Sequence, residues 1–254
     1  MEALIFAAGE GRRLRPLTDT TPKALIDVAG RTALERVVDA VVAAGAHHIV
    51  VNAHHLADRV EEAALALARP GVRISVSRED IEFNRPLETG GGLAHARPLL
   101  EAEEPFFLHN ADILTDLDLA GVYRAHVEGA ARDGRLATLV VTGRQTSRPL
   151  LVDETGVFGR RNRAEGWEVV ARHPGDGTRE VGFSGIHVLS PDILPWFDAV
   201  STYSIIEIYM RVVGDGDVIG CFDAGDSVWH DIGNPERLER ARTALGGPGA
   251  GAGA

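Results

Sequence analysis

The fold is decided near the start of the chain by Ala3-Leu4-Ile5-Phe6-Ala7-Ala8-Gly9-Glu10-Gly11-Arg12-Arg13-Leu14-Arg15-Pro16-Leu17-Thr18, followed closely by Thr21-Pro22-Lys23. A short apolar run that passes directly into a glycine- and arginine-rich loop is typical of a buried strand ending at a ligand. Gly9 and Gly11 leave backbone N–H groups unobstructed, while Arg13, Arg15 and Lys23 add positive charge. The stretch therefore predicts a loop that holds a polyphosphate.

Two common glycine loops do not fit this stretch. A dinucleotide-binding loop needs a third glycine, and Leu14 stands at that position. A P-loop needs Gly-Lys-Ser/Thr, whereas Gly11 is followed by Arg12 and Arg13. The loop must belong to a different class of nucleotide-binding protein.

Composition limits the partners and the compartment. The chain has 254 residues and a formal net charge of −11, which disfavours nucleic acid and anionic membranes as partners and favours small-molecule substrates. The single cysteine, Cys221, cannot form an internal disulfide, and no apolar segment approaches the length of a membrane span. We expect a cytoplasmic protein, and the oligomeric state stays open.

Apolar runs and amphipathic segments alternate through the first half of the chain, which is the pattern of a parallel sheet flanked by helices. The strands are predicted at Leu4–Ala8, His48–Asn52, Arg73–Ser77, Pro105–Leu108 and Leu136–Thr142. The helices are predicted at Ala33–Ala44, Ala57–Ala68, Gly92–Leu100 and Leu119–Ala131. We predict one Rossmann-like, three-layer α/β domain with a mostly parallel mixed sheet over residues 1–245, and a disordered Gly/Ala tail over 246–254.

The alternation ends after Thr142. Leu150–Asp153, Val157–Arg161 and Trp167–Ala171 are short apolar runs separated by turn residues, which predicts a small antiparallel subregion on the substrate side. A buried strand is predicted again at Phe183–Leu189.

Two aspartates follow predicted strands. Asp112 lies in His109-Asn110-Ala111-Asp112, and Asp231 lies in Trp229-His230-Asp231-Ile232-Gly233-Asn234. Carboxylates at the carboxyl edge of a sheet can hold Mg²⁺, a hard cation that prefers oxygen ligands. Local roles are equally open: Asp112 could cap a turn, and Gly233 could adopt a positive φ in a turn that Asn234 caps.

A run of three glycines ends Leu87-Glu88-Thr89-Gly90-Gly91-Gly92, just before a predicted helix. Consecutive glycines cost chain entropy unless the backbone passes close to another group. The run is expected to be either a ligand-binding loop or a flexible helix N-terminus.

These four clusters together resemble the nucleotidyltransferase (sugar-nucleotide pyrophosphorylase) family. The family's first motif reads Leu-Ala-Ala-Gly-x-Gly-x-Arg-Leu-Arg-Pro-Leu-Thr and then Pro-Lys, commonly followed by a second proline. This chain has Phe6 in place of the leucine and Ala24 in place of the second proline. The resemblance continues to about Ala241 through the Asn110–Asp112 and Trp229–Gly233 motifs. The wording Leu-Glu-Thr-Gly-Gly-Gly resembles bacterial uridylyltransferases that act on N-acetylmuramate 1-phosphate more than the guanylyl or thymidylyl branches.

The resemblance implies a set of site residues. It implies Mg²⁺ held by Asp112 and Asp231, and a catalytic set of Arg13, Lys23 and Asp112. The implied nucleotide-binding set is Ala8, Gly9, Gly11, Arg13, Lys23, Glu88, Gly90, Gly91 and Asn110.

The sugar side matches the family less completely. Phe183-Ser184-Gly185-Ile186 resembles a family strand, which implies that Gly185 lets the sugar lie against backbone; Glu207 could accept sugar hydroxyls or face solvent. The family's Glu-Lys-Pro segment, whose lysine meets the sugar phosphate, is absent from residues 160–174. Arg148 or Arg161 could supply that charge, or could be solvated surface side chains.

The implied activity is Mg²⁺-dependent condensation of a nucleoside triphosphate, with UTP favoured, and a sugar 1-phosphate such as N-acetylmuramate 1-phosphate. The products are a nucleoside-diphosphate sugar and pyrophosphate. Mannose-1-phosphate guanylyltransferase and phosphocholine cytidylyltransferase are alternatives with the same chemistry. A non-catalytic nucleotide-binding regulatory subunit is the alternative of another class.

Overall fold

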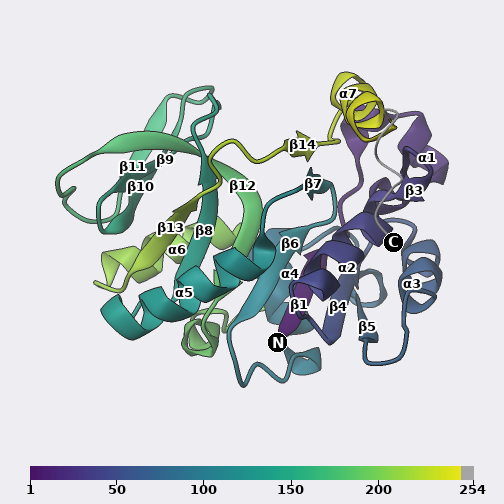
Figure 1. Cartoon of the computed structure of the whole chain (residues 1–254), viewed down its shortest axis with the longest axis horizontal. Coiled ribbons are helices and arrows are strands. Elements are labelled where there is room, and N and C mark those ends of the chain that lie inside the picture. Colours follow the sequence, from purple (N-terminus) through teal and green to yellow (C-terminus); the bar gives the residue numbers. More distant parts are fainter. Residues whose placement is uncertain (247–254) are drawn as a thin grey trace.

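The apolar run at the start of the chain forms β1 (Glu2–Phe6), a central strand of a ten-stranded sheet in the computed structural model, which describes residues 1–246. β4 (His48–Ala53) and β6 (Phe106–Asn110) pair with β1 on either side, and β5 (Arg73–Arg78) pairs with β4. All of these pairs are parallel, so the four strands end at one edge of the sheet (Figure 1). Open α/β sheets bind ligands at this edge.

Within residues 1–246, the rest of the chain forms the remaining strands and seven α-helices, besides short 3₁₀ helices. The other strands within residues 1–246 are β2 (Asp27–Val28), β3 (Arg31–Thr32), β7 (Ile113–Thr115), β8 (Ala137–Thr142), β9 (Leu150–Asp153), β10 (Gly156–Asn162), β11 (Trp167–Val170), β12 (Arg179–Leu189), β13 (Ile219–Asp223) and β14 (Trp229–Asp231). The α-helices in the same range are α1 (Leu17–Thr20), α2 (Ala33–Ala43), α3 (Ala57–Leu65), α4 (Glu88–Ala96), α5 (Leu119–Asp133), α6 (Ile205–Gly214) and α7 (Pro235–Gly246).

The predicted antiparallel subregion is confirmed, and β12 joins it to the parallel part of the sheet. The second half of β12 pairs antiparallel with β6 and β8, while its first residues, Arg179–Val181, pair with β9. β10 pairs with β9 and β11, so the three strands β9, β10 and β11 extend from the sheet as an arm (Figure 1). β13 pairs parallel with β8 and completes a mixed sheet.

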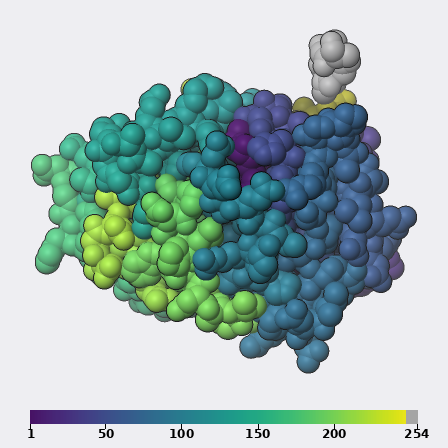
Figure 2. Space-filling view, turned by 90° about the horizontal axis from the view of Figure 1, so that it is seen from below, coloured from purple at the N-terminus to yellow at the C-terminus, as the bar shows by residue number. Residues whose placement is uncertain are grey.

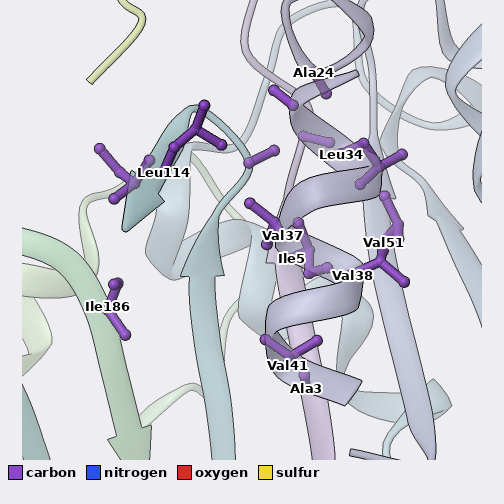
Figure 3. Close-up of a cluster of buried hydrophobic side chains, with 14 of the residues drawn as sticks. Ala3, Ile5, Ala24, Leu34, Val37, Val38, Val41, Val51, Leu114 and Ile186 are labelled. Carbon is purple, nitrogen blue, oxygen red and sulfur yellow. The ribbon is translucent and has the colours of Figure 1, made fainter. Parts of the chain in front are cut away.

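Side chains alternate across the sheet and build two separate cores, which confirms the three-layer α/β prediction. Ile5 in β1 and Val51 in β4 pack under α2, as Figure 3 shows, together with Val37 and Val41 of that helix. Leu4 in β1 points to the opposite face, where α4 and α6 cover it. Each fully buried aliphatic side chain of this size stabilises the fold by about 1.5–3 kcal/mol.

The amino ends of the central strands lie on the face opposite the ligand edge. Viewed from below, the N-terminal residues reach the surface between blue and teal segments (Figure 2). Glu2 of β1 is buried there and accepts hydrogen bonds from the backbone N–H of Ala102, at 2.6 Å, and of Glu101, at 3.2 Å. These hydrogen bonds tie the segment before β6 to the amino end of β1.

The structure corrects the prediction around the three glycines. They lie inside α4, which begins at Glu88 and not at Gly92, so the prediction of a helix starting after the glycines was wrong. The backbone N–H of Gly90 donates to the carbonyl oxygen of Tyr203 at 3.0 Å, and a Cβ at Gly91 would lie 1.8 Å from the carbonyl oxygen of Ser201. The glycines allow α4 to pack closely against the segment that leads into α6.

The C-terminal helix α7 reaches Gly246, which is the first residue of the predicted tail. The rest of that tail, residues 247–254, lies outside the described residues. Within residues 1–246, every helix is too short or too polar to cross a lipid bilayer.

Candidate active site

A cavity of about 420 Å³ opens at the carboxyl ends of β1 and β6. Ala8 and Gly9 line it from the loop after β1, and Asn110 and Asp112 line it from the end of β6. A Cβ at Gly9 would meet no atom within 4 Å among the described residues, so the space beside this backbone is open. The predicted polyphosphate loop thus lies at a cavity wall.

Lys23 and Asp112 form an ion pair at this cavity. Lys23 begins a 3₁₀ helix (Lys23–Leu25) directly after Pro22, and the hydrogen bond to Asp112 holds its ammonium group at the cavity wall. The two side chains are 15% and 23% exposed, so both are largely shielded from solvent while still lining the cavity. The structure therefore brings together two residues that are 89 positions apart in the chain.

A buried network that the sequence analysis missed holds the loop after β1. The backbone N–H of Ala7 donates to Oδ1 of Asn52 at 2.7 Å, and Nδ2 of Asn52 donates to the Glu79 carboxylate at 2.6 Å. Glu79 also accepts from the backbone N–H of Leu87 at 3.0 Å, and burial raises the pKa of its carboxyl group. Asn52 is the last residue of a predicted strand beside β1. A polar residue at such a strand end was the signal in the sequence that could have identified this network.

Asp231 lies beside Asp112 on a neighbouring segment. β14 pairs antiparallel with β7, and the backbone N–H of Ile232 donates to the carbonyl oxygen of Asp112 at 3.0 Å. The Asp231 carboxylate accepts from the backbone N–H of Gly233 at 2.7 Å and forms an ion pair with Arg237. Both predicted metal-ligand residues therefore lie at one edge of the sheet, each paired with a cation.

Gly233 keeps this corner of the site narrow. A Cβ at Gly233 would lie 2.7 Å from a guanidinium nitrogen of Arg13 and 2.6 Å from Oδ1 of Asp231. Gly233 has no positive φ, so the left-handed turn that the sequence left open is not present, and the glycine serves close approach. Asn234 caps α7, accepting from the backbone N–H of Arg237 at 2.9 Å.

Several predicted nucleotide-binding residues lie away from the wall of this cavity. Arg13 is exposed and lies beside Gly233, and Gly11 adopts a φ of +63° with the side chain of Thr18 against it. Gly90 and Gly91 are buried in α4, as described above. The close contacts of Gly11, Gly90 and Gly91 are therefore with other residues of the protein.

A second cavity, of about 450 Å³, lies between the β9–β11 arm and α6. Its lining includes Arg144, Arg160 and Trp167. Glu88 and Arg148 line both this cavity and the first one, which places the two side by side. Glu88 has a φ of 60°, a backbone conformation that non-glycine residues rarely adopt and that is often found at functional sites.

The two residues predicted for the sugar side have structural partners of their own. Gly185, with a φ of +83°, makes room for Asn110, because a Cβ at Gly185 would lie 2.7 Å from Nδ2 of Asn110. Glu207 is exposed, accepts from the backbone N–H of Ser204 at 3.3 Å as part of a capping box for α6, and lines the second cavity. Oδ1 of Asn110 is buried without a hydrogen-bond partner in the described chain.

Comparisons with known proteins agree on one family. The family model described as Nucleotidyl transferase matches residues 2–149. The chain is 32% identical to the N-acetylmuramate alpha-1-phosphate uridylyltransferase of Caulobacter vibrioides, over 96% of each chain. It is also 32% identical to the mannose-1-phosphate guanyltransferase beta-A of Xenopus laevis, where the match covers 93% of this chain and 62% of the longer relative.

A solved structure confirms the fold. The inositol-1-phosphate CTP transferase of T. maritima superposes with a TM-score of 0.72 at 20% sequence identity. The match covers 97% of this chain and 96% of that one, so the arm and the parallel sheet are shared together.

Proposed function

The chain belongs to the nucleotidyl transferase family, and from that premise we propose that it condenses a nucleoside triphosphate with a sugar 1-phosphate. UTP and N-acetylmuramate 1-phosphate are the favoured pair, because the relative named for that activity matches over nearly the full length of both chains. An oxygen of the sugar phosphate attacks the α-phosphorus of the triphosphate and forms a new P–O bond. The bond to the β-phosphate oxygen breaks, and pyrophosphate leaves.

The observation that carries this proposal is the pair of adjoining cavities. The first is lined by Ala8, Gly9 and Lys23 and suits the triphosphate; the second, lined by arginines and Trp167, suits the sugar phosphate. Arg148 lines both, so the two substrates would meet beside its guanidinium group. Holding two reactants in such an arrangement lowers the entropic part of the barrier.

The chemistry asks for positive charge and positioning. A sugar phosphate is already an anionic nucleophile near neutral pH, so the reaction needs no general base. The obstacle is repulsion between two polyanions, together with charge that builds up around the transferring phosphorus. Lys23, held at the cavity wall by Asp112, offsets this charge on the triphosphate side.

Mg²⁺ is part of the proposal, and the donor set fits it. Asp112 and Asp231 offer carboxylate oxygens from two hydrogen-bonded segments, and Mg²⁺ prefers oxygen ligands from one or two carboxylates plus substrate phosphates. When bound, the ion would neutralise phosphate charge. Lys23 and Arg237, which pair with the two carboxylates in this structure, would then be released toward phosphate oxygens.

The test is pyrophosphate release with Mg²⁺ across the four nucleoside triphosphates and several acceptors, including mannose 1-phosphate and phosphocholine. We expect turnover for one nucleotide–acceptor pair, with UTP and N-acetylmuramate 1-phosphate strongest. Pyrophosphate release that is strongest with GTP or CTP would assign the protein a different nucleotide and acceptor from the favoured pair. Nucleotide binding with no turnover for any pair would instead support a regulatory subunit and overturn the proposal.

Two variants connect the activity with this site. Lys23→Ala and Asp112→Asn should each lower turnover by about 100-fold or more, as loss of a group that stabilises transition-state charge does elsewhere. Arg124→Ala is the control, because Arg124 is exposed on α5, pairs with Asp118 at 3.2 Å and lies outside the cavity wall. Near wild-type turnover of folded Lys23→Ala or Asp112→Asn would contradict the assignment.

A further inference from the structure

The second cavity contains two arginines held in the same way. The guanidinium carbon of Arg144 lies 4.0 Å from the ring centroid of Trp229, and that of Arg160 lies 4.9 Å from the ring centroid of Trp167. In each, the Nε atom is buried and has no hydrogen-bond partner within residues 1–246. Stacking on an aromatic ring fixes the plane of a guanidinium group, and its Nη groups remain as the donors for an anion.

These two arginines differ from Arg148 and Arg161, which line the same cavity, in their ion pairing. Arg161 pairs with Glu168 and Glu180, and Arg148 lies 3.7 Å from the carboxylate of Glu165. In the part of the chain that the structure describes, neither Arg144 nor Arg160 has a carboxylate within ion-pair distance. The cavity therefore holds two guanidinium groups that no carboxylate pairs directly, although Glu88 and Glu207 also line it.

The two arginines lie in different parts of the cavity system. Arg144 also lines the cleft that contains Asp231 and Arg237, and its guanidinium donates to the carbonyl oxygen of Phe183. It is therefore near the proposed metal and the reacting centre. Arg160, on β10 in the arm, lines the second cavity but neither that cleft nor the first cavity.

We infer that the acceptor carries two acidic groups: Arg144 binds its reacting phosphate, and Arg160 binds a carboxylate elsewhere on the sugar. This inference rests on the proposed function. Arg144 would take the place of the lysine that the Glu-Lys-Pro segment supplies in similar proteins. An arginine binds a carboxylate through two parallel N–H···O bonds, a geometry that an uncharged sugar hydroxyl does not match.

A matched pair of acceptors tests the inference directly. N-acetylmuramate 1-phosphate carries a lactyl carboxylate, and N-acetylglucosamine 1-phosphate is the same sugar phosphate without it. The wild-type protein should use the first with a kcat/KM at least about 10-fold higher, as expected for a charge-assisted hydrogen bond. Equal use of the two acceptors would overturn the inference.

Variants then assign the two charges to residues. Arg160→Gln should lower kcat/KM for the lactyl acceptor by about 10- to 100-fold, chiefly through KM, and leave that for N-acetylglucosamine 1-phosphate unchanged. Arg144→Gln should lower both to a similar extent, because both acceptors share the phosphate. Arg163→Gln is the control, since Arg163 is exposed and pairs with Glu180 outside the cavity wall. Equal losses on both acceptors in Arg160→Gln would contradict its role.

Calorimetric binding of the same two sugar phosphates separates this inference from the proposed function. Tighter binding of the lactyl sugar that depends on Arg160, without pyrophosphate release for any nucleotide, would contradict the proposed function and keep the inference. Turnover with equal affinity for both sugar phosphates would support the proposed function and contradict the inference. Urea unfolding of each variant shows that a lost affinity does not come from a lost fold.

Discussion

Replacing Gly9 by alanine should separate ligand binding from folding. A Cβ at Gly9 meets no atom within 4 Å in the described part of the chain, and its φ lies outside the left-handed region. Alanine is therefore accommodated in the folded protein, and stability should stay the same or rise by about 0.4–1 kcal/mol, because the unfolded chain loses freedom.

The same methyl group would enter the space where we place the triphosphate. Ala8 and Gly9 both line the first cavity, so a phosphate bound against this backbone would have to move away from its N–H groups. Loss of one hydrogen bond to a charged group costs about 1.5–3 kcal/mol. This corresponds to binding of the nucleoside triphosphate that is weaker by about 10- to 150-fold.

Gly91→Ala provides the contrast. Its Cβ would lie 1.8 Å from the carbonyl oxygen of Ser201, so α4 or the segment before α6 must shift, and overpacking of this kind costs about 1–3 kcal/mol or more. Urea unfolding and calorimetric titration with nucleoside triphosphate, applied to both variants, measure the two effects. Unchanged nucleotide affinity in Gly9→Ala, or a loss of stability as large as that of Gly91→Ala, would refute the reasoning.

Two further predictions concern the supports of the site. Asn52→Ala leaves the buried N–H of Ala7 without its acceptor, so it should destabilise the fold by about 1–3 kcal/mol in urea unfolding and raise the KM for nucleotide, whereas a rise in stability would contradict the network. The Arg172 guanidinium holds the pKa of the buried Asp153 carboxyl well below its usual range, so this residue should stabilise the fold above about pH 4 and lose that effect as the pH falls. Asp153→Asn should therefore be less stable at pH 7 and flatten the acid limb of stability followed by circular dichroism; an unchanged limb would refute this.

The triphosphate side of the site could be predicted from sequence because its signals are local. β1 and β6 are buried and largely apolar, and each is followed by residues that line the cavity. In a parallel sheet, a residue that directly follows a strand lies at the carboxyl edge, where ligands bind, so its place can be predicted from the strand alone. Asn110 and Asp112 lie at the cavity for this reason, whereas Lys23 was expected there from its charge and from the family resemblance.

The glycine helix could not be predicted, because its cause is distant in the chain. Three glycines in succession disfavour a helix by about 1 kcal/mol each, so local propensity argues for a loop. The helix exists because the carbonyl oxygen of Tyr203 accepts from Gly90, and because only glycine tolerates Ser201 at that distance. These partners are more than 100 positions away in the sequence, and no local pattern contains them.

Strand register explains why Arg161, one of the two arginines that the sequence offered for the sugar phosphate, is ion-paired while its neighbour Arg160 is not. In the antiparallel pair of β10 with β11, Arg161 is opposite Glu168, and Asn162 is opposite Trp167. Opposite residues share a face, so Arg161 closes an ion pair across the strands, while Arg160 lies on the face of Trp167, one diagonal step away.

A slip of one residue would exchange the two arginines. The sequence shows two adjacent arginines with an acid and a tryptophan on the next strand, but it does not state the pairing. Pairing neutralises Arg161 and leaves Arg160 charged and stacked, so in this arm the charge offered to a ligand is set by register rather than by composition.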